Sequence, residues 1–366
     1  MRLTLVIPGL DDAGGAERVM ATLANAWARR GWPVTLLTFD DGAEPPFYPL
    51  DPAIDHRPLA IAGASDSPLS AVAANLRRVR VLRRAIAASK PDVVVSFMDQ
   101  TNIVVLLATR GLGLPVIVAE HNDPAHHPIG RGWGSLRRAL YPRATRVAML
   151  TERAASHFAP AIRRRVAVIP NPIALPAPDP ARQAGNDGGP TLVAVGRLDA
   201  QKGFDLLLRA FARIAPNHPE WRLVIWGNGP QRDDLERLRD DLGLAARVSL
   251  PGTTDRIHQK LDTSDLFVLS SRYEGFPMAL CEAMAVGLPV VAFDCPTGPR
   301  EIVRPGIDGV LVPPEDVAAL AAALDRLMGD PAERRRRAER APEVLDRFGL
   351  EPVLAIWDDV LREARR

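Results

Sequence analysis

The sequence predicts an α/β protein built from two Rossmann-like, doubly wound domains that face a central cleft. Short apolar runs alternate with amphipathic stretches of helix length along the whole chain. A chain of 366 residues is longer than one hydrophobic core usually supports, so two domains are the natural division. The apolar runs predict two sets of strands, near residues 2–7, 33–39, 92–97, 115–119 and 145–150 and near residues 191–196, 221–226, 246–250, 265–270 and 288–293.

The two predicted domains meet in a segment that is rich in proline and polar residues. Prolines recur over residues 170–180, and a polar, glycine-containing run follows over residues 183–189, so regular structure is not expected there. The sequence therefore predicts an N-terminal domain over residues 1–170 and a C-terminal domain over residues 171–345. Residues 346–366 have the pattern of a final amphipathic helix.

Composition narrows the class of protein. The 46 Lys and Arg residues and 44 Asp and Glu residues leave a formal net charge of +2, so we expect no nucleic acid partner. The first residues do not resemble a signal peptide, and no apolar run approaches the roughly 18 residues of a membrane-spanning helix. The two cysteines, Cys281 and Cys295, fit a reducing compartment. We therefore expect a cytoplasmic protein.

Two glycines stand between the first predicted strand and the first helix. Gly14 and Gly15 follow the apolar run of residues 5–7 and a short polar loop. Because glycine has no side chain, such a pair lets the main chain approach a bound ligand closely. The same pair also fits a tight turn that binds nothing.

A basic amphipathic helix is predicted over residues 69–86. Its apolar residues recur at steps of three and four and predict one buried stripe, formed by Leu69, Val72, Leu76, Val79, Leu82 and Ile86. Arg77, Arg80 and Arg84 line one flank of this helix, and no acidic residue follows at the spacing that would pair with them. This crowding favours a nearby anion, such as a lipid diphosphate or anionic headgroups. A solvated basic helix face is the alternative.

The predicted strand over residues 115–119 leads directly into a polar cluster. His121 should therefore emerge at the carboxyl edge of a parallel sheet, where ligands of open α/β sheets bind. A histidine with a purely structural role remains the alternative, because most of the seven histidines should be of that kind.

In the second half of the chain, several predicted strands are each followed closely by a glycine. The strand over residues 193–195 breaks at Gly196 and is followed by Arg197 and Lys202, two cations that can neutralise a leaving diphosphate. Two ordinary exposed loop cations are the alternative. Gly227 and Gly252 end two further strands in the same way.

Residues 274–282 contain two carboxylates, Glu274 and Glu282, around a Gly-Phe-Pro turn that opens a helix near Pro277. Glu274 lies at the mouth of that helix and Glu282 further along it, so the free N–H groups of the first turn face the same space. This arrangement is typical of a binding site for a sugar nucleotide, with the diphosphate at the helix N-terminus. A solvated helix start with acidic residues there by chance is the alternative.

Taken together, these segments resemble the retaining glycosyltransferases of family 4, which have the GT-B fold. The resemblance covers residues 1 to about 345 and rests on the Gly14-Gly15 loop, Glu120-His121, the loop over residues 196–203 and the two glutamates. The first half is most similar to bacterial enzymes that add N-acetylgalactosamine to polyprenyl-diphosphate-linked oligosaccharides. Residues 14–18, residues 96–103, Glu120-His121 and the basic helix before Lys90 carry this closer similarity.

The resemblance implies a nucleotide-sugar site in the second domain. Arg197 and Lys202 would hold the donor diphosphate, and Glu282 would hold the ribose. Glu274 would bind the sugar and phosphates together with the main chain of Gly275, Phe276, Pro277, Met278, Ala279 and Leu280. The rest of the implied donor set is Gly14, Gly15, Gly227 and Gly252. His121, Glu274, Arg197 and Lys202 are the expected catalytic groups, with His121 beside the transferred sugar.

An acceptor site in the first domain is implied in the same way. In the related enzymes a basic helix binds the lipid diphosphate, and its cationic positions match Arg77, Arg78, Arg83 and Arg84, whereas Arg80 is particular to this chain. The final helix is expected to cross back to the first domain. The expected location is the cytoplasmic face of the cell membrane, as a peripheral protein.

The sequence and the resemblance predict a retaining hexosyltransferase that moves N-acetylgalactosamine from a UDP-sugar to a lipid-linked glycan during glycan assembly. No two aspartates are separated by a single residue, so the Asp-x-Asp metal clamp is missing and neither a metal nor another cofactor is expected. A family-4 enzyme with a soluble acceptor is one alternative. A non-catalytic sugar-nucleotide-binding protein or a nucleotide-sugar epimerase is the other.

Overall fold

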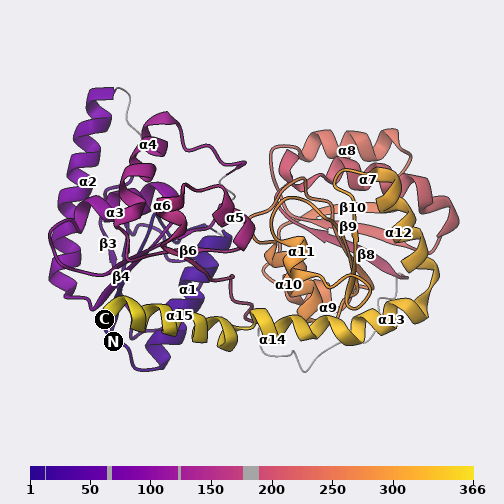
Figure 1. The fold of residues 1–366 in the computed structure, drawn as a ribbon. Helices are drawn as coiled ribbons and strands as arrows, with labels where there is room; N and C mark the ends of the chain where they lie inside the picture. The colour runs from indigo at the N-terminus through magenta and orange to yellow at the C-terminus, as the bar shows by residue number, and fades with distance from the viewer. Residues whose placement is uncertain (13, 64–67, 123–124, 176–188) are drawn as a thin grey trace. The chain divides into compact units, whose positions relative to one another are not determined.

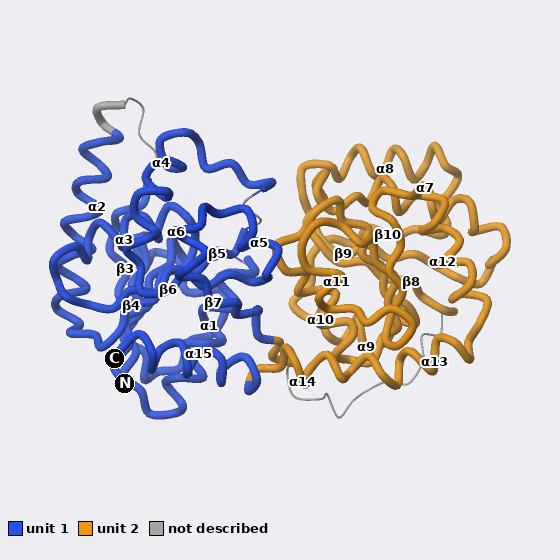
Figure 2. Tube along the Cα trace, in the orientation of Figure 1, with its two compact units in different colours: residues 1–172, 351–366 blue, residues 173–350 orange. Residues whose placement is uncertain are grey.

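The structure is a computed structural model that describes residues 1–12, 14–63, 68–122, 125–175 and 189–366 (Figure 1). It contains two compact units, drawn in blue and orange in Figure 2. Unit 1 comprises Met1–Pro172 with Glu351–Arg366, and unit 2 comprises Ile173–Leu350. The sequence prediction set the corresponding divisions after residues 170 and 345, and most of its proline-rich and polar junction lies outside the described residues.

Unit 1 is built on a parallel sheet of seven strands in the order β3-β2-β1-β4-β5-β6-β7. The strands are β1 Leu3–Ile7, β2 Val34–Thr38, β3 Asp55–Pro58, β4 Val93–Phe97, β5 Val116–Glu120, β6 Arg146–Met149 and β7 Val166–Val168. Five of them, β1, β2, β4, β5 and most of β6, are buried, as expected for near-continuous apolar runs covered by helices. The direction of strand order reverses between β1 and β4, which in open sheets marks a binding crevice at the carboxyl ends.

Helices connect these strands and cover the sheet. They are α1 Gly15–Arg29, α2 Pro68–Ser89, α3 Asp99–Ala108, α4 Arg131–Leu140, the 3-10 turn η1 Tyr141–Arg143, α5 Glu152–Ser156 and α6 Pro160–Arg163. The last helix of the chain, α15 Leu350–Arg365, packs on unit 1 although it follows unit 2 in sequence. There Trp357 meets Trp27 edge to face at 6.0 Å, and Arg30 Nη1 donates to Asp358 at 2.8 Å.

Unit 2 has a parallel sheet of six strands in the order β10-β9-β8-β11-β12-β13. The strands are β8 Thr191–Val195, β9 Arg222–Trp226, β10 Val248–Gly252, β11 Leu266–Leu269, β12 Val290–Phe293 and β13 Gly309–Val312. The longer helices are α7 Phe204–Ile214, α8 Arg232–Asp241, α10 Met278–Ala285, α12 Val317–Gly329 and α13 Pro331–Arg340. Short helices complete the unit, namely η2 Ala200–Lys202, η3 Ala215–Asn217, α9 Ile257–Asp262, α11 Pro299–Ile302, η4 Ala341–Val344 and α14 Leu345–Phe348.

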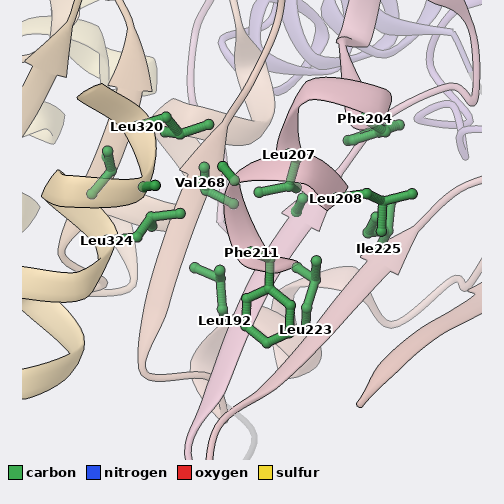
Figure 3. Close-up of a cluster of buried hydrophobic side chains, with 14 of the residues drawn as sticks. Leu192, Phe204, Leu207, Leu208, Phe211, Leu223, Ile225, Val268, Leu320 and Leu324 are labelled. Carbon is green, nitrogen blue, oxygen red and sulfur yellow. The ribbon is translucent and has the colours of Figure 1, made fainter. Parts of the chain in front are cut away.

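The core of unit 2 lies between its sheet and the helices α7 and α12. Figure 3 shows Leu207, Leu208 and Phe211 of α7 beside Leu192 and Leu223 of the sheet. All five side chains are fully buried. This core fixes the carboxyl ends of β8 and β11, from which the loops of the candidate site emerge.

All ten strands predicted from apolar runs are present within one or two residues of their expected bounds. The prediction missed β3, β7 and β13. The β3 residues are mostly exposed, with the exposed polar pair Asp55 and Arg57, so this edge strand has no apolar run to announce it.

The predicted apolar stripe of α2 is wrong over its first half. Leu82 and Ile86 are buried in the core, but Val72 is 60% exposed and Leu76 is 49% exposed. Only the second half of α2 packs against the apolar cluster that includes α3, so the periodicity continues beyond the surface that covers it. The side chain of Leu69 lies outside the described part of the chain.

Candidate active site

The loop after β8 presents the two predicted cations of unit 2 in different environments. Arg197 is 72% exposed at its side chain, and its Nε lies 3.8 Å from Asp199. Lys202 is only 21% exposed, and its main-chain N–H donates to the Asp199 side chain at 3.3 Å, which caps the short helix η2. Arg197 is therefore free to reach an approaching ligand, whereas Lys202 is held in place by the fold.

Gly203 joins this loop to α7 in a backbone conformation that excludes a side chain. Its φ is 61°, and a Cβ there would lie 2.1 Å from the carbonyl oxygen of Ser270. The Ser270 hydroxyl in turn donates to the Lys202 carbonyl at 2.8 Å. The loops after β8 and β11 are thus in close contact, and this contact brings Lys202 beside Glu274.

Lys202 and Glu274 form an ion pair at the start of α10. The Lys202 Nζ lies 2.7 Å from Glu274 Oε1, and the Ser271 hydroxyl donates to the same oxygen at 2.6 Å. The Thr297 hydroxyl donates to the Glu274 carbonyl. Glu274 is 4% exposed, so a carboxylate in an apolar setting is stabilised by a cation and a hydroxyl that approach one of its oxygens.

Glu282 lies at the fifth position of α10, within its second turn. It is 4% exposed, and Pro277 occupies the N-cap without a side-chain cap. The first N–H groups of a helix have no partner within the helix and carry its positive partial charge. The Lys202 ammonium pairs with Glu274, four residues before the start of α10, so a cation and the N-terminus of a helix both adjoin this segment, an arrangement suited to an anion.

Gly227 has a packing reason that the sequence prediction did not include. A Cβ on Gly227 would lie 1.9 Å from the Gly196 carbonyl oxygen, and the Gly227 N–H donates to Gly252 at 2.8 Å. Gly227 thus lets the ends of β8 and β9 approach one another, whereas a Cβ on Gly252 would make only an ordinary contact at 3.8 Å with the Arg232 side chain. Their predicted contact with a donor stays a prediction.

In unit 1, His121 directly follows β5 at the carboxyl edge of the sheet. Both of its ring nitrogens are buried without a hydrogen-bond partner among the described residues. Its ring contacts Phe97 with centroids 4.1 Å apart, and burial lowers the pKa of His121 to about 3. The imidazole is therefore neutral near pH 7, and it can serve as a hydrogen-bonding group but not as a cationic acid.

A small cavity of about 10 Å³ adjoins His121 and is lined also by Val19, Asn171 and Trp357. A cavity of this size is at the lower limit for one water molecule. Contact between His121 and a sugar therefore requires the ring or its surroundings to move from the arrangement in this structure.

The glycine loop of unit 1 has the predicted position. Gly14 is the N-cap of α1 and Gly15 is its first residue. Apart from its chain neighbours and the backbone of its own helix, no described atom lies within 4 Å of a Cβ built on Gly15, whereas one on Gly14 would meet the Glu17 carboxylate. Open space beside Gly15 fits the close approach of a ligand.

The arginines of α2 divide into two groups. Arg78 Nε donates to the Ile61 carbonyl at 2.9 Å, and Arg83 Nη1 donates to the carbonyls of Ala108 and Arg110 at 2.8 and 2.7 Å. These two therefore bind the main chain of unit 1, although the resemblance matched both to cations that bind a lipid diphosphate. Arg77, Arg80 and Arg84 are exposed, with Arg77 making one long contact of 3.4 Å to a carbonyl.

Several residues that contact the predicted groups were not predicted. Ser271 stands three residues before Glu274, so a hydroxyl within reach of a carboxylate was a signal that the sequence offered. Thr297 and Tyr141 gave no such signal, because they lie 23 and 21 residues from the groups they contact, Glu274 and Glu120.

Comparison with known proteins identifies the family. The profile described as Glycosyl transferase 4-like domain matches residues 14–172, and the profile described as Glycosyl transferases group 1 matches residues 178–344. The chain belongs to the GT-B glycosyltransferases that combine these two domains.

Individual relatives align with the whole chain. An exopolysaccharide phosphotransferase of Streptomyces coelicolor is 32% identical over 392 aligned residues, which cover 99% of this chain but 41% of that protein. The chain thus spans less than half of that relative's length.

A second relative is similar over its full length. The GalNAc-alpha-(1->4)-GalNAc-alpha-(1->3)-diNAcBac-PP-undecaprenol alpha-1,4-N-acetyl-D-galactosaminyltransferase of Campylobacter jejuni is 27% identical, with 100% of this chain and 99% of that protein aligned. Among solved structures, Anabaena HepE in complex with UDP superposes with a TM-score of 0.76 at 20% identity, covering 99% of both chains. That likeness supports the shared fold.

Proposed function

We propose that this glycosyltransferase moves a hexosyl unit, N-acetylgalactosamine, from a UDP-sugar to a polyprenyl-diphosphate-linked glycan with retention of configuration. The observation that carries the proposal is the Lys202–Glu274 pair at the mouth of α10. The full-length similarity to the Campylobacter enzyme supports the choice of sugar and acceptor class.

The donor site follows from the charges of unit 2. The UDP diphosphate takes the place of the Glu274 carboxylate as partner of the Lys202 ammonium, and the exposed Arg197 adds a forked donor. The first N–H groups of α10 complete the anion site. Glu274, released from Lys202, accepts hydrogen bonds from sugar hydroxyls, and Glu282 accepts from the ribose diol.

The proposed chemistry depends on stabilising departing UDP. As the bond between the anomeric carbon and the phosphate oxygen breaks, negative charge grows on the diphosphate, and Lys202 and Arg197 neutralise it. The acceptor hydroxyl attacks from the face that UDP leaves, and its proton passes to the departing phosphate oxygen. A glycosidase-type route needs a carboxylate nucleophile on the opposite face of the sugar, and Glu274 has the role of orienting the sugar instead.

The metal requirement follows from the same groups. Because protein cations and helix N–H groups neutralise the diphosphate, we expect transfer to need no divalent ion and no other cofactor. His121 contributes a neutral hydrogen-bonding group to the sugar hydroxyls, since burial lowers its pKa to about 3.

The exposed arginines of α2 favour the lipid-linked acceptor. Arg77, Arg80 and Arg84 extend from a helix that contains no Asp or Glu and that also exposes the side chains of Val72 and Leu76. Cations next to apolar groups suit a diphosphate on a polyprenyl chain at the cytoplasmic membrane surface. Within the described residues, no helix is long and apolar enough to cross a bilayer.

The reaction is tested with a panel of UDP-hexoses, a short polyprenyl-diphosphate glycan and EDTA, with product masses as the readout. We expect one added N-acetylhexosamine on the lipid glycan in the presence of EDTA. Transfer only to a soluble sugar would replace the acceptor assignment, and turnover that stops with EDTA would remove the metal-free scheme. No turnover with any donor would favour a binding protein.

A charge test separates the lipid-linked from the soluble acceptor. The triple variant Arg77→Ala, Arg80→Ala, Arg84→Ala should raise KM for the lipid glycan at least about tenfold while KM for the donor stays constant. The matched control is Arg335→Ala with Arg336→Ala, two exposed cations on α13 of unit 2. Equal KM values for the lipid glycan in the triple variant and the control would mean that the arginines of α2 form a solvated basic face and do not bind the acceptor.

A further inference from the structure

Two segments that resemble the N-acetylgalactosamine-adding enzymes have no part in the donor or lipid sites, yet the structure joins them. They are the segment after Val95 in β4, which continues into α3, and Glu120 at the end of β5. The hydroxyl of Ser96 donates to Asn102 Oδ1 at 2.7 Å. The Asn102 amide donates to the Ala119 carbonyl at 2.9 Å and lies 3.1 Å from the Tyr141 hydroxyl.

Tyr141 extends this chain of hydrogen bonds to Glu120. Its hydroxyl donates to Glu120 Oε1, and Arg137 Nη1 of α4 lies 3.8 Å from the same oxygen. Tyr141 and Asn102 are fully buried, and Glu120 is 4% exposed. Every hydrogen bond of this chain is therefore shielded from water. In the protein interior hydrogen bonds are strong, and a polar group without a partner is costly.

The network connects the carboxyl ends of two neighbouring strands. Ser96 lies in β4, Asn102 in α3, Ala119 and Glu120 in β5, and Tyr141 in η1. The next residue after Glu120 is His121, whose two ring nitrogens have no partner in the described structure. Among the described residues no side chain hydrogen-bonds the imidazole, so its position depends on the main chain at Glu120 and on its packing against Phe97, the residue after Ser96.

We propose that the buried Ser96–Asn102–Tyr141–Glu120 network positions His121, and that Tyr141 and Glu120 are positioning residues for glycosyl transfer. This inference rests on the proposed function and deepens it. The network acts through the main chain of β5 and touches no substrate. It gives a structural role to a carboxylate that is buried at the carboxyl edge of the unit 1 sheet.

Two conservative variants and one matched control test the role. Tyr141→Phe removes one hydroxyl, and Glu120→Gln keeps the shape of the side chain while removing its charge. The control is Ser89→Ala, which removes another buried hydroxyl of unit 1, bonded to Thr4 at 2.7 Å and not to the network. Thermal unfolding of all three variants first establishes that they fold.

Kinetics give the first readout. We expect kcat to fall between about 10-fold and 100-fold in Tyr141→Phe and in Glu120→Gln, because small displacements of a catalytic group are costly. KM for the UDP-sugar should stay within about twofold, since the donor groups lie in unit 2. The kcat of the double variant should fall no further than that of the more impaired single variant, because both substitutions break the same network.

The second readout does not depend on turnover. In protein with ¹⁵N-labelled histidine, the ring signals of His121, assigned with His121→Ala, should shift in both network variants and stay in place in Ser89→Ala. Unshifted His121 signals together with normal kcat in folded network variants would overturn the proposal. If the wild-type chain transfers no sugar, the proposed function fails, and unshifted His121 signals would still refute the positioning role while shifted ones would support it.

Discussion

At the scale of single residues, two buried carboxylates are each held by donors that approach one oxygen. Glu274 accepts hydrogen bonds from Lys202 and Ser271. Glu120 accepts one from Tyr141, and Arg137 lies further away at 3.8 Å. Such carboxylates have fixed orientations, and removal of a partner leaves a buried charge without compensation. Their responses to mutation and to pH should therefore differ from those of the exposed ion pairs elsewhere in the chain.

The Lys202–Glu274 pair gives a prediction for activity and for stability. Glu274→Gln and Lys202→Met should each lower kcat roughly 100-fold, because each removes a group that orients or neutralises the donor. Without donor, Lys202→Met should also lower the free energy of unfolding by about 1–3 kcal/mol, since Glu274 keeps its charge and loses its cation. Steady-state kinetics and urea unfolding measure the two effects.

The control for this pair is an exposed one. Arg237 and Asp234 form an ion pair with side chains 74% and 63% exposed, so Arg237→Met should change stability by less than about 1 kcal/mol. Full turnover in Glu274→Gln would remove its assigned role in orienting the sugar.

Glu120 gives a prediction for the pH dependence of stability. Burial raises the pKa of Glu120 from 4.5 to about 7, against the opposing effects of the Tyr141 hydroxyl and Arg137. The nearby Asp99 carboxylate adds to the rise. Because the folded pKa is above the unfolded one, the folded state binds more protons between these values. This contribution to stability is complete below about pH 4.5 and is lost as pH rises to about 7.

The measurement is the free energy of unfolding of wild type and Glu120→Gln from pH 4.5 to pH 8. Glutamine cannot ionise, so the variant should gain stability relative to wild type across this range, by roughly 3 kcal/mol from the size of the shift. Glu351→Gln, at a side chain that is 76% exposed, is the matched control for replacing a glutamate by glutamine. A difference between Glu120→Gln and wild type that stays constant over this pH range would contradict the raised pKa of Glu120.

At the scale of elements, apolar patterning predicts the strands that are buried on both faces of a sheet. It does not predict how much of a helix is covered, or which residues distant in sequence contact one another. Strands such as β1, β4 and β5 are nearly continuous apolar runs, so their positions followed from the sequence. The stripe of α2 had the correct period, but periodicity does not state how far a covering surface extends. The residues proposed to bind the donor could be named from their motifs and stay a prediction, whereas the Glu120–Tyr141 contact joins residues 21 apart through folding alone.

The two halves of α2 should respond differently to the same substitution. Leu82 is fully buried, so Leu82→Ala should lower the free energy of unfolding by about 2–5 kcal/mol. Leu76 is 49% exposed, so Leu76→Ala should change it by less than about 0.5 kcal/mol. Urea unfolding without lipid or substrate measures both. Equal losses would mean that the first half of α2 is covered in solution.

At the scale of the whole molecule, the chain is not divided into two consecutive pieces. Unit 2 is continuous, whereas unit 1 is completed by α15 after the chain has formed unit 2. The α15 residues Val353, Leu354, Trp357 and Leu361 are buried. Asp358 accepts hydrogen bonds from Trp27 Nε1 and from Arg30, which ties the end of the chain to α1.

This division predicts that the two units differ in their ability to fold alone. Residues 173–350 should unfold cooperatively and bind UDP, because their sheet and core are complete and the proposed diphosphate cations lie within them. Residues 1–172 should not unfold cooperatively, since the apolar surface beneath α15 is left open. Joining residues 351–366 to residue 172 through a flexible Gly/Ser linker should restore a cooperative transition. Circular dichroism during thermal unfolding and calorimetric titration with UDP measure these outcomes, and Lys202→Met in the 173–350 fragment is the binding control. A cooperative transition in residues 1–172 alone would show that unit 1 folds without α15. A folded 173–350 fragment that does not bind UDP would contradict the proposal that unit 2 alone contains the donor site.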